Sequence, residues 1–385
     1  MIPYGRQSVS EKDIQAVVDV LRSDFLTQGP RVPAFERAIA AHVGAKHAVA
    51  VNSATSALHL ACLVLGLGAG DALWTSPNSF VASSNCGLYC GARVDFVDID
   101  PRTYNMCPRA LRRKLETARS AGRLPKIVVP VHFSGQSSDM DAIGELAREF
   151  GFRVIEDASH AIGGSWRGSP VGSCAHSDIA VFSFHPVKII TSGEGGMILT
   201  NDAALASRAI ELRSHGVTRD PDRMVRPGGG AWRYEQIGLG FNYRMTEMQA
   251  ALGLSQLEEL VRFVVARHAL AARYDEALRD LPLVLPWRHP DSYSALHLYV
   301  VQIEDHAPIG RMELFERLRE EGIGVNVHYI PIHTQPYYSA LGFQVGDFPL
   351  AERYYSRAIS LPLYADMSEA AQDHVISALI EALRR

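Results

Sequence analysis

The sequence predicts an α/β protein in which helices cover a large, mainly parallel sheet. Two patterns in its 385 residues lead to this prediction. Up to about residue 245, short β-rich runs alternate with helical or turn segments, as they do in βαβ units. A long proline-free helical stretch follows, and then a shorter mixed stretch of strands and helices. We therefore expect a large domain over 1–245, a connecting helix over 246–280 and a small domain over 281–385.

The strand candidates of the large domain occupy 46–51, 71–76, 93–99, 126–133, 152–157, 178–184 and 197–200. Residues 140–150 have apolar side chains at helical spacing directly before the fifth candidate, as expected for a crossover helix. A stretch rich in Gly, Pro and Arg, 216–240, interrupts the alternation. Thr246 is a good N-cap for a helix running to about Arg279. In the last part, 297–303 and 325–330 resemble strands, and an amphipathic helix ends the sequence.

Composition narrows the class of protein. The 38 basic and 42 acidic residues give a net charge of −4, which argues against nonspecific binding to nucleic acids. Five cysteines without CxxC spacing suggest free thiols rather than a zinc site or disulfide framework. The sequence starts without a charged segment followed by an apolar core, and no run approaches ~18 apolar residues. We expect a cytoplasmic protein that does not associate with membranes.

The most informative residues are Lys188 and Asp157. Lys188 lies between an apolar strand candidate and a Gly-containing turn, and Asp157 lies where the strand FRVI gives way to polar residues. In open α/β sheets, ligands bind at the carboxyl ends of strands. A lysine and an acid at two such ends suit pyridoxal 5'-phosphate (PLP), because its aldehyde takes an amine and its pyridine nitrogen needs a carboxylate. Each residue alone has an ordinary alternative, a surface lysine or a turn aspartate.

A phosphate site is predicted where the strand AVAV meets the apolar helix that follows. Asn52, Ser53, Ala54 and Thr55 form this junction, and backbone N–H groups at a helix N-terminus bind phosphate. The same string also occurs where Ser or Thr simply caps a helix. Ser183, five residues before Lys188, supplies another hydroxyl.

Several segments resemble the DegT/DnrJ-type nucleotide-sugar aminotransferases: NSATSALHLA, TSPNSFVASSN, EDASHAIG, FSFHPVKIITSGEGG, RSHGV, GLGFNYRMTEMQAALGLSQL and HYIPIH. The likeness runs from about residue 26 to about residue 333, with the motifs in the same order. It implies fold type I, the aspartate aminotransferase-like fold of PLP-dependent enzymes, with PLP as cofactor.

The resemblance also implies roles for individual residues. Lys188 would form the Schiff base, Asp157 would pair with the pyridine nitrogen, and Phe80 would stack on the cofactor face. His160 lies where many members have a glutamine near the phenolic oxygen, so its hydrogen-bonding role is open. The phosphate would be held by Ser53, Ala54, Thr55 and Ser183, and by Asn242 from a neighbouring subunit. Such sharing implies a homodimer.

Substrate-binding candidates are fewer and less specific. Arg219, Arg223, Arg226 and Arg233 lie in the interrupting stretch, where guanidinium groups would clamp a diphosphate or simply be solvated. His328 and His333 in HYIPIH have the family position near the substrate sugar, and their spacing does not suit a metal site, so no metal is assigned. The substrate-binding set is completed by His185 and Arg244.

The resemblance implies transamination of a nucleotide-linked keto-deoxy sugar with L-glutamate as amino donor. EDASHAIG and FSFHPVK are most similar to members of the pseudaminic-acid pathway, which aminate C4 of a UDP-linked 4-keto-6-deoxy-N-acetylhexosamine. A dTDP-linked 3-keto or 4-keto sugar stays open. A PLP-dependent sugar dehydratase is a further alternative, although deoxysugar dehydratases of this fold have histidine where Lys188 stands. A non-catalytic regulatory protein is another, although no helix-turn-helix DNA reader is appended.

Overall fold

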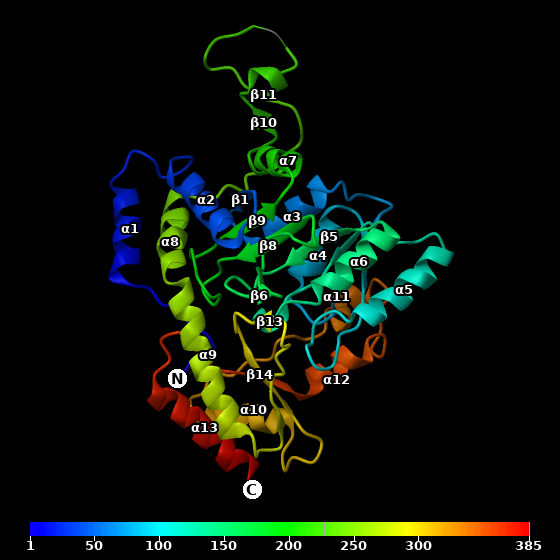
Figure 1. The fold of residues 1–385 in the computed structure, drawn as a ribbon, viewed down its shortest axis with the longest axis vertical. Coiled ribbons are helices and arrows are strands. Elements are labelled where there is room, and N and C mark those ends of the chain that lie inside the picture. Colours follow the sequence, from blue (N-terminus) through cyan, green and yellow to red (C-terminus); the bar gives the residue numbers. More distant parts are fainter. Residues whose placement is uncertain (227, 385) are drawn as a thin grey trace.

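The large sheet has seven strands in the order β1-β9-β8-β5-β4-β2-β3 (Figure 1). The computed structural model describes residues 1–226 and 228–384. Pro227 of the Arg-rich stretch and Arg385 of the predicted small domain lie outside the described residues. The strands are β1 (His47–Val51), β2 (Ala72–Thr75), β3 (Arg93–Phe96), β4 (Ile127–Val129), β5 (Arg153–Asp157), β8 (Ile179–Ser183) and β9 (Gly196–Thr200). Each coincides with one of the strand candidates, which confirms the α/β prediction.

The sheet is parallel except at β9. Strands β3, β2, β4, β5 and β8 pair in parallel, and β9 lies antiparallel between β8 and β1. Asp157, the last residue of β5, pairs with Val181 of β8. The carboxyl ends of β5 and β8 therefore lie side by side at one edge of the sheet, where ligands of open α/β proteins bind.

Helices pack on both faces of the sheet (Figure 1). They are α2 (Arg31–Val43), α3 (Ala54–Val64), α4 (Ala82–Tyr89), α5 (Pro108–Ser120), α6 (Met140–Phe150) and α7 (Ala203–Arg213). Helix α1 (Glu11–Leu21) lies outside them, away from the sheet (Figure 1). Helix α6 has the predicted bounds, because Asp139 caps its first turn and Gly151 at φ 79° ends it. Buried side chains of α5 and α6, including Leu111, Leu115 and Ile143, pack against the sheet residue Val128.

The connecting segment consists of two helices rather than one. Helix α8 (Glu247–Glu258) begins at Thr246, which forms a capping box with Gln249, and α9 (Leu260–Leu278) continues after Glu259. The break was not visible in the sequence because no Pro or Gly marks it and the apolar stripe runs through it. Helix α8 packs against α1 and α2, whereas α9 crosses to the C-terminal part and packs against α13 (Glu369–Leu383).

The C-terminal part is built on an antiparallel sheet of β12 (Leu283–Val284), β14 (Tyr299–Ile303) and β15 (Ala358–Leu361). Helices α10 (Arg311–Glu320), α11 (Pro336–Ser339) and α12 (Pro349–Arg357) complete it with α13, the predicted final helix. The strand predicted at 325–330 is wrong: only Asn326 forms a bridge, to Ser360. Its apolar residues are explained by burial instead, since Val325 lies in the core. The N-terminus also joins this part, where Ile2 pairs with Ile323.

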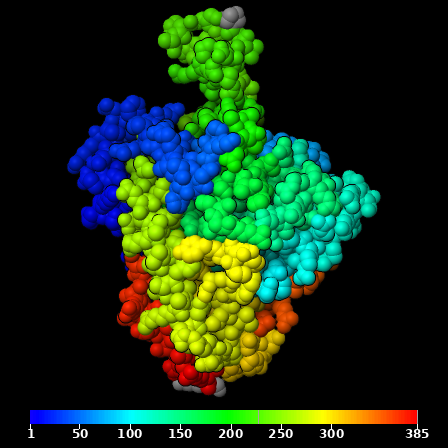
Figure 2. Space-filling model, viewed as in Figure 1, coloured from blue at the N-terminus to red at the C-terminus, as the bar shows by residue number. Residues whose placement is uncertain are grey.

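Shorter elements fill the connections: β6 (Ser165–Trp166), β7 (Ser169–Pro170), β13 (Ser292–Tyr293) and the 3-10 turns η1 (Phe133–Gly135) and η3 (Ile332–Thr334). The Arg-rich stretch forms a hairpin of β10 (Val217–Thr218) and β11 (Glu235–Gln236), with η2 (Pro221–Arg223) near its tip. This hairpin projects from the body of the molecule beyond α7 (Figures 1 and 2). None of the described helices has the length and apolar character that crossing a membrane requires.

Candidate functional site

Lys188 lies in the connection between β8 and β9, directly beyond the carboxyl end of β8. The connection is a tight one, because Phe184 N–H donates to Gly195 O and Ser192 N–H donates to Phe184 O, both within 3.0 Å. Lys188 N–H donates to His185 O at 2.9 Å, which closes the turn around the lysine. The backbone thus holds a half-buried amine at the strand exit next to β5.

Asp157 ends β5, and only 4% of its surface is exposed. Its carboxylate accepts hydrogen bonds from the hydroxyl groups of Ser83 and Ser159, both at 2.6 Å, and from the Ser159 N–H at 3.2 Å. Ser83 comes from α4, so two elements distant in sequence orient this carboxylate. Hydrogen bonds to an ionised acceptor are short and strong, and they stabilise the charged form of a buried acid.

The two charges influence each other across the strand ends. Burial lowers the pKa of Lys188 to about 8, and the negative charge of Asp157 offsets part of this effect. About a tenth of an amine with this pKa is neutral at pH 7, far more than for an ordinary lysine, and the neutral form is the one that attacks an aldehyde. The carboxylate and the amine therefore supply complementary chemistry: one stabilises positive charge on a ligand, and the other binds a carbonyl carbon.

His160 is buried beside these two residues and is held as a neutral imidazole. Burial, followed by the positive charge of Lys188, lowers the pKa of His160 well below its ordinary value. Ser134 N–H donates to its Nδ1 at 3.3 Å, so the proton resides on Nε2, which lies 3.1 Å from the Tyr329 hydroxyl. His160 therefore donates to Tyr329, and the Tyr329 hydroxyl proton is available to another acceptor.

His328 and His333 occupy different environments. His328 is buried, its Nδ1 lies 2.7 Å from the Ser360 hydroxyl, and burial with the charge of Lys188 lowers its pKa to about 3. His333 instead pairs with Glu352 at 2.8 Å and packs on Phe348. Lys188, Asp157, His160, His328 and Tyr329 are called the lysine cluster below. In the described part of the chain, no contact of His333 reaches this cluster. The structure thus brings only the first of the two histidines to the site.

The residues of the predicted phosphate site lie at the N-terminus of α3. Ser53 is the N-cap, and its hydroxyl accepts from Ser56 N–H at 3.1 Å, which leaves the N–H groups of Ala54 and Thr55 without acceptors among the described residues. Gly196 makes this junction possible: a Cβ there would lie 2.4 Å from Ser53 O and 2.7 Å from Ala54 N. Ser183 pairs with Gly196, so its hydroxyl lies on the strand next to the helix terminus.

The other predicted residues lie around this cluster. Phe80 is 60% exposed, with its ring 6.4 Å from that of Tyr329, as a face free to stack on a ligand should be. Asn242 and His185 are exposed, and Arg244 is half-buried with Nε unpaired within the described residues. The segment of Asn242 lies close to the phosphate site, because Asn52 N–H donates to Tyr243 O at 2.8 Å.

The arginines of the β10–β11 hairpin are not brought to Lys188. Arg223 pairs with Glu211 of α7, and Arg233 pairs with Glu235. Arg219 lies 6.0 Å from the Tyr234 ring centroid, and Arg226 donates its backbone N–H to Glu235. The hairpin projects away from the sheet (Figure 1), so within one subunit these residues lie apart from the lysine cluster.

The donor set fits PLP. It comprises an amine of lowered pKa, a buried carboxylate for a protonated ring nitrogen, and free N–H groups at a helix terminus for a phosphate. Sequence reasoning missed three polar neighbours: Ser83, Ser159 and Tyr329. Ser159 was detectable, since a serine two residues after an aspartate commonly bonds to it in a turn. Ser83 lies 74 residues from Asp157, and no local pattern marks it.

Comparison with known proteins agrees with this chemistry. The profile of the DegT/DnrJ/EryC1/StrS aminotransferase family matches residues 7–380. The spore coat polysaccharide biosynthesis protein SpsC of Bacillus subtilis is 41% identical over 387 residues, covering 100% of this chain and 97% of SpsC. Both matches extend over nearly the whole sequence and confirm the family resemblance.

Solved structures of similar proteins confirm the fold. Helicobacter pylori PseC, an aminotransferase involved in the biosynthesis of pseudoaminic acid, superposes with a TM-score of 0.91 at 30% identity, covering 100% of this chain and 99% of PseC. The PLP form of Spr1654, a putative sugar aminotransferase from Streptococcus pneumoniae, gives 0.89 at 28% identity, covering 99% of this chain and 98% of Spr1654. The chain therefore belongs to the DegT/DnrJ/EryC1/StrS family and is a PLP-dependent sugar aminotransferase.

Proposed function

We propose that the enzyme transfers an amino group from L-glutamate to C4 of a UDP-linked 4-keto-6-deoxy-N-acetylhexosamine, as a step toward pseudaminic acid. The observation that carries the proposal is Lys188, an amine with a pKa of about 8 beside the buried carboxylate of Asp157. The full-length likeness to PseC supports this choice of sugar. The higher identity to SpsC, named for spore coat polysaccharide biosynthesis, favours a second candidate: a different activated sugar, including a dTDP-linked 3-keto or 4-keto sugar.

The residues of the chain would divide the work as follows. Lys188 would hold the cofactor through its amine and, once released, would carry a proton, since its pKa lets it gain and lose one near neutral pH. Asp157, fixed by Ser83 and Ser159, would keep the ring nitrogen protonated. Bound there, PLP supplies an electron sink that allows a C–H bond beside an amino group to break. Ser53, Ala54, Thr55 and Ser183 would hold its phosphate.

The ring faces and the neutral imidazole complete the arrangement. Phe80 would cover one face of the cofactor, and the exposure of its side chain leaves the phenyl ring free to make this contact. His160, which donates to Tyr329, would place the tyrosine hydroxyl toward the reacting groups. Because Asn242 is exposed and the hairpin arginines project from the body, we propose that both reach the site of a neighbouring subunit in a homodimer. There Arg219 and Arg226 would contact the diphosphate of the substrate, with His185, Arg244 and His328 near the sugar.

Two measurements test the proposal. Titration of the PLP-loaded enzyme with L-glutamate alone should shift the cofactor absorbance to that of its amine form. A dehydratase or a regulatory protein has no need to convert the cofactor in this way, so the absence of the shift would favour those alternatives. Assays with UDP-linked and dTDP-linked 3-keto and 4-keto sugars then identify the acceptor. We expect the highest kcat/KM with the UDP-linked 4-keto N-acetyl sugar, and a preference for any dTDP-sugar would contradict the first candidate.

Lys188→Ala provides the internal control. This variant should bind PLP but lose turnover, and borohydride should no longer attach the cofactor to the peptide that carries residue 188. Near-normal activity in Lys188→Ala would refute the assignment of the lysine.

A further inference from the structure

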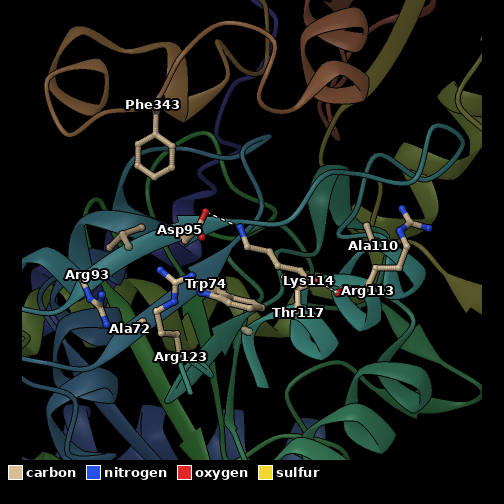
Figure 3. Close-up of a pocket in the computed structure, with 12 residues that line it drawn as sticks. Ala72, Trp74, Arg93, Asp95, Ala110, Arg113, Lys114, Thr117, Arg123 and Phe343 are labelled. Carbon is tan, nitrogen blue, oxygen red and sulfur yellow. Dashed lines mark hydrogen bonds and ion pairs between the residues drawn. The ribbon is translucent and has the colours of Figure 1, made fainter. Parts of the chain in front are cut away.

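A second cavity lies away from the catalytic residues, between the sheet edge and α5 (Figure 3). Its volume is about 630 Å³, within the range of small-molecule sites. Strands β2 and β3 supply its floor, α5 supplies one wall, and Phe343 of the C-terminal part overhangs it. The cavity thus lies where the two parts of the chain meet.

The cavity is distinct from the PLP site. Ala72 and Arg93, which line it, are the first residues of β2 and β3, whereas Asp157 is the last residue of β5. These strands pair in parallel through β4, so their amino and carboxyl ends lie at opposite edges of the sheet. The cavity continues along β3 to Asp95 and Phe343, and Phe343 packs on Phe96 at the end of that strand. Strands β4 and β2 separate β3 from β5, so the cavity lies at the β3 side of the sheet, away from Asp157.

Positive charge dominates the lining. Arg93, Arg113, Lys114 and Arg123 face one acidic residue, Asp95. Lys114 is already committed: its Nζ lies 2.6 Å from Asp95 and 5.0 Å from the centre of the Trp74 ring. Among the described residues, no carboxylate pairs with any of the three arginines of the lining. In Figure 3, Arg93 and Arg123 lie on one side of the cavity and Arg113 lies on the other, beyond Lys114.

The three arginines are exposed, and what distinguishes them from other surface arginines is their position around one hollow. Elsewhere on α5, Arg112 pairs with Glu149 at 2.9 Å, and Arg119 lies over the Phe150 ring at 4.8 Å. The arginines at the cavity come from three separate segments: the start of β3, α5, and the loop before β4. Arg93 and Arg123, which lie on the same side of the hollow in Figure 3, repel each other, and a bound anion would relieve that repulsion.

The lining also indicates what kind of anion fits. Guanidinium groups match phosphate oxygens through paired hydrogen bonds. One phosphate carries about −1.5 to −2 charge, less than the three unpaired arginines carry together. Between them lie Ala72, Val94, Ala110, Ala118 and the half-buried ring of Phe343, which offer apolar contact to an organic group.

We propose that this cavity binds a small organic diphosphate, with Arg93 and Arg123 contacting its phosphates and Phe343 contacting its organic part. A nucleoside diphosphate has this chemistry. Because Phe343 belongs to the C-terminal part and the arginines belong to the sheet edge and α5, an occupant would contact both parts at once. The site would then be a second, non-catalytic ligand site, whatever sugar the enzyme aminates.

Calorimetric titration of the PLP-loaded enzyme with inorganic pyrophosphate, UDP and ADP tests the proposal. We expect Arg93→Gln/Arg123→Gln to bind pyrophosphate and ADP at least about tenfold more weakly than the wild type, because each arginine contributes charge-assisted hydrogen bonds. UDP should lose one of two binding events, since the substrate site remains. Aminotransferase kcat at saturating substrate should be retained.

The matched control is Arg112→Gln/Arg119→Gln, which removes the same charge from α5 outside the cavity. Its affinity for the three probes should equal that of the wild type. The proposal is overturned if none of the probes binds at millimolar concentration, or if the two double variants weaken binding equally, since the effect would then come from overall charge.

Discussion

The hydrogen bonds to Asp157 make Ser83 the most informative position for mutation. Ser83 Oγ donates to Asp157 Oδ2 at 2.6 Å, whereas both bonds from Ser159 go to Oδ1. Ser83→Ala therefore removes the only donor that the described residues offer to Oδ2. A hydrogen bond to an ionised group contributes about 1.5–3 kcal/mol, and each 1.36 kcal/mol corresponds to a tenfold change in rate. We expect kcat/KM to fall about tenfold to a hundredfold.

Ser79→Ala is the matched control for this substitution. Ser79 is as buried as Ser83, and its Oγ lies 2.7 Å from Ser83 Oγ, but it does not touch Asp157. Because the only proton of Ser83 Oγ goes to the carboxylate, Ser79 must donate to Ser83. Its loss should cost less than about threefold, through weaker polarisation of the next bond. Stopped-flow mixing with L-glutamate measures both variants, and equal losses in the two would refute the reasoning.

Three further predictions concern the amine, the phosphate site and the subunit contact. The pKa of Lys188 is lowered to about 8, so the neutral fraction of its amine increases about tenfold from pH 7 to 9. The rate of PLP association with cofactor-free enzyme should increase by the same factor and then level off. A rate that continues to rise toward pH 10.5 would contradict the lowered pKa. Gly196→Ala places a Cβ 2.4 Å from Ser53 O and should weaken PLP binding by at least tenfold in equilibrium dialysis, whereas Gly68→Ala, with open space around it, should not. If Asn242 serves a neighbouring subunit, mixing Asn242→Ala with Lys188→Ala should restore activity that each lacks, and no recovery would argue against sharing.

Local patterns predicted the large sheet well because its strands are short apolar runs bounded by turns. The pattern at 325–330 was equally strand-like, yet Val325 and His328 are buried by tertiary packing without a ladder partner. Such a run of apolar residues indicates burial rather than strand pairing, so the sequence does not distinguish a buried strand from a buried segment outside a sheet. The break between α8 and α9 at Glu259 could not be predicted for a related reason. Glu259 has φ −91° and ψ −5°, a backbone conformation that needs no special side chain.

The candidate site could be predicted from the sequence where the proposed role depends on a chemical type of residue at a strand end. Lys188 and Asp157 follow from that rule, and Ser53 to Thr55 follow from the strand-to-helix junction. Ser83 and Tyr329 did not follow, because their roles depend on distances set by packing between segments 74 or more residues apart. The hairpin arginines show the converse: their composition suggested a clamp, but glutamates of the same subunit hold Arg223 and Arg233.

The geometry of His160 depends on how the C-terminal part is docked. The N–H group that fixes its tautomer belongs to Ser134, and the carbonyl of that residue accepts from His297 N–H at 2.9 Å. The buried guanidinium of Arg267 on α9 in turn donates to the carbonyls of Leu296, His297 and Leu363. The chain of bonds thus runs from α9 through 296–298 to the imidazole beside Lys188. Because a buried carbonyl that loses its donor is costly, movement of α9 relative to the sheet would disturb the hydrogen bond that directs His160 toward Tyr329.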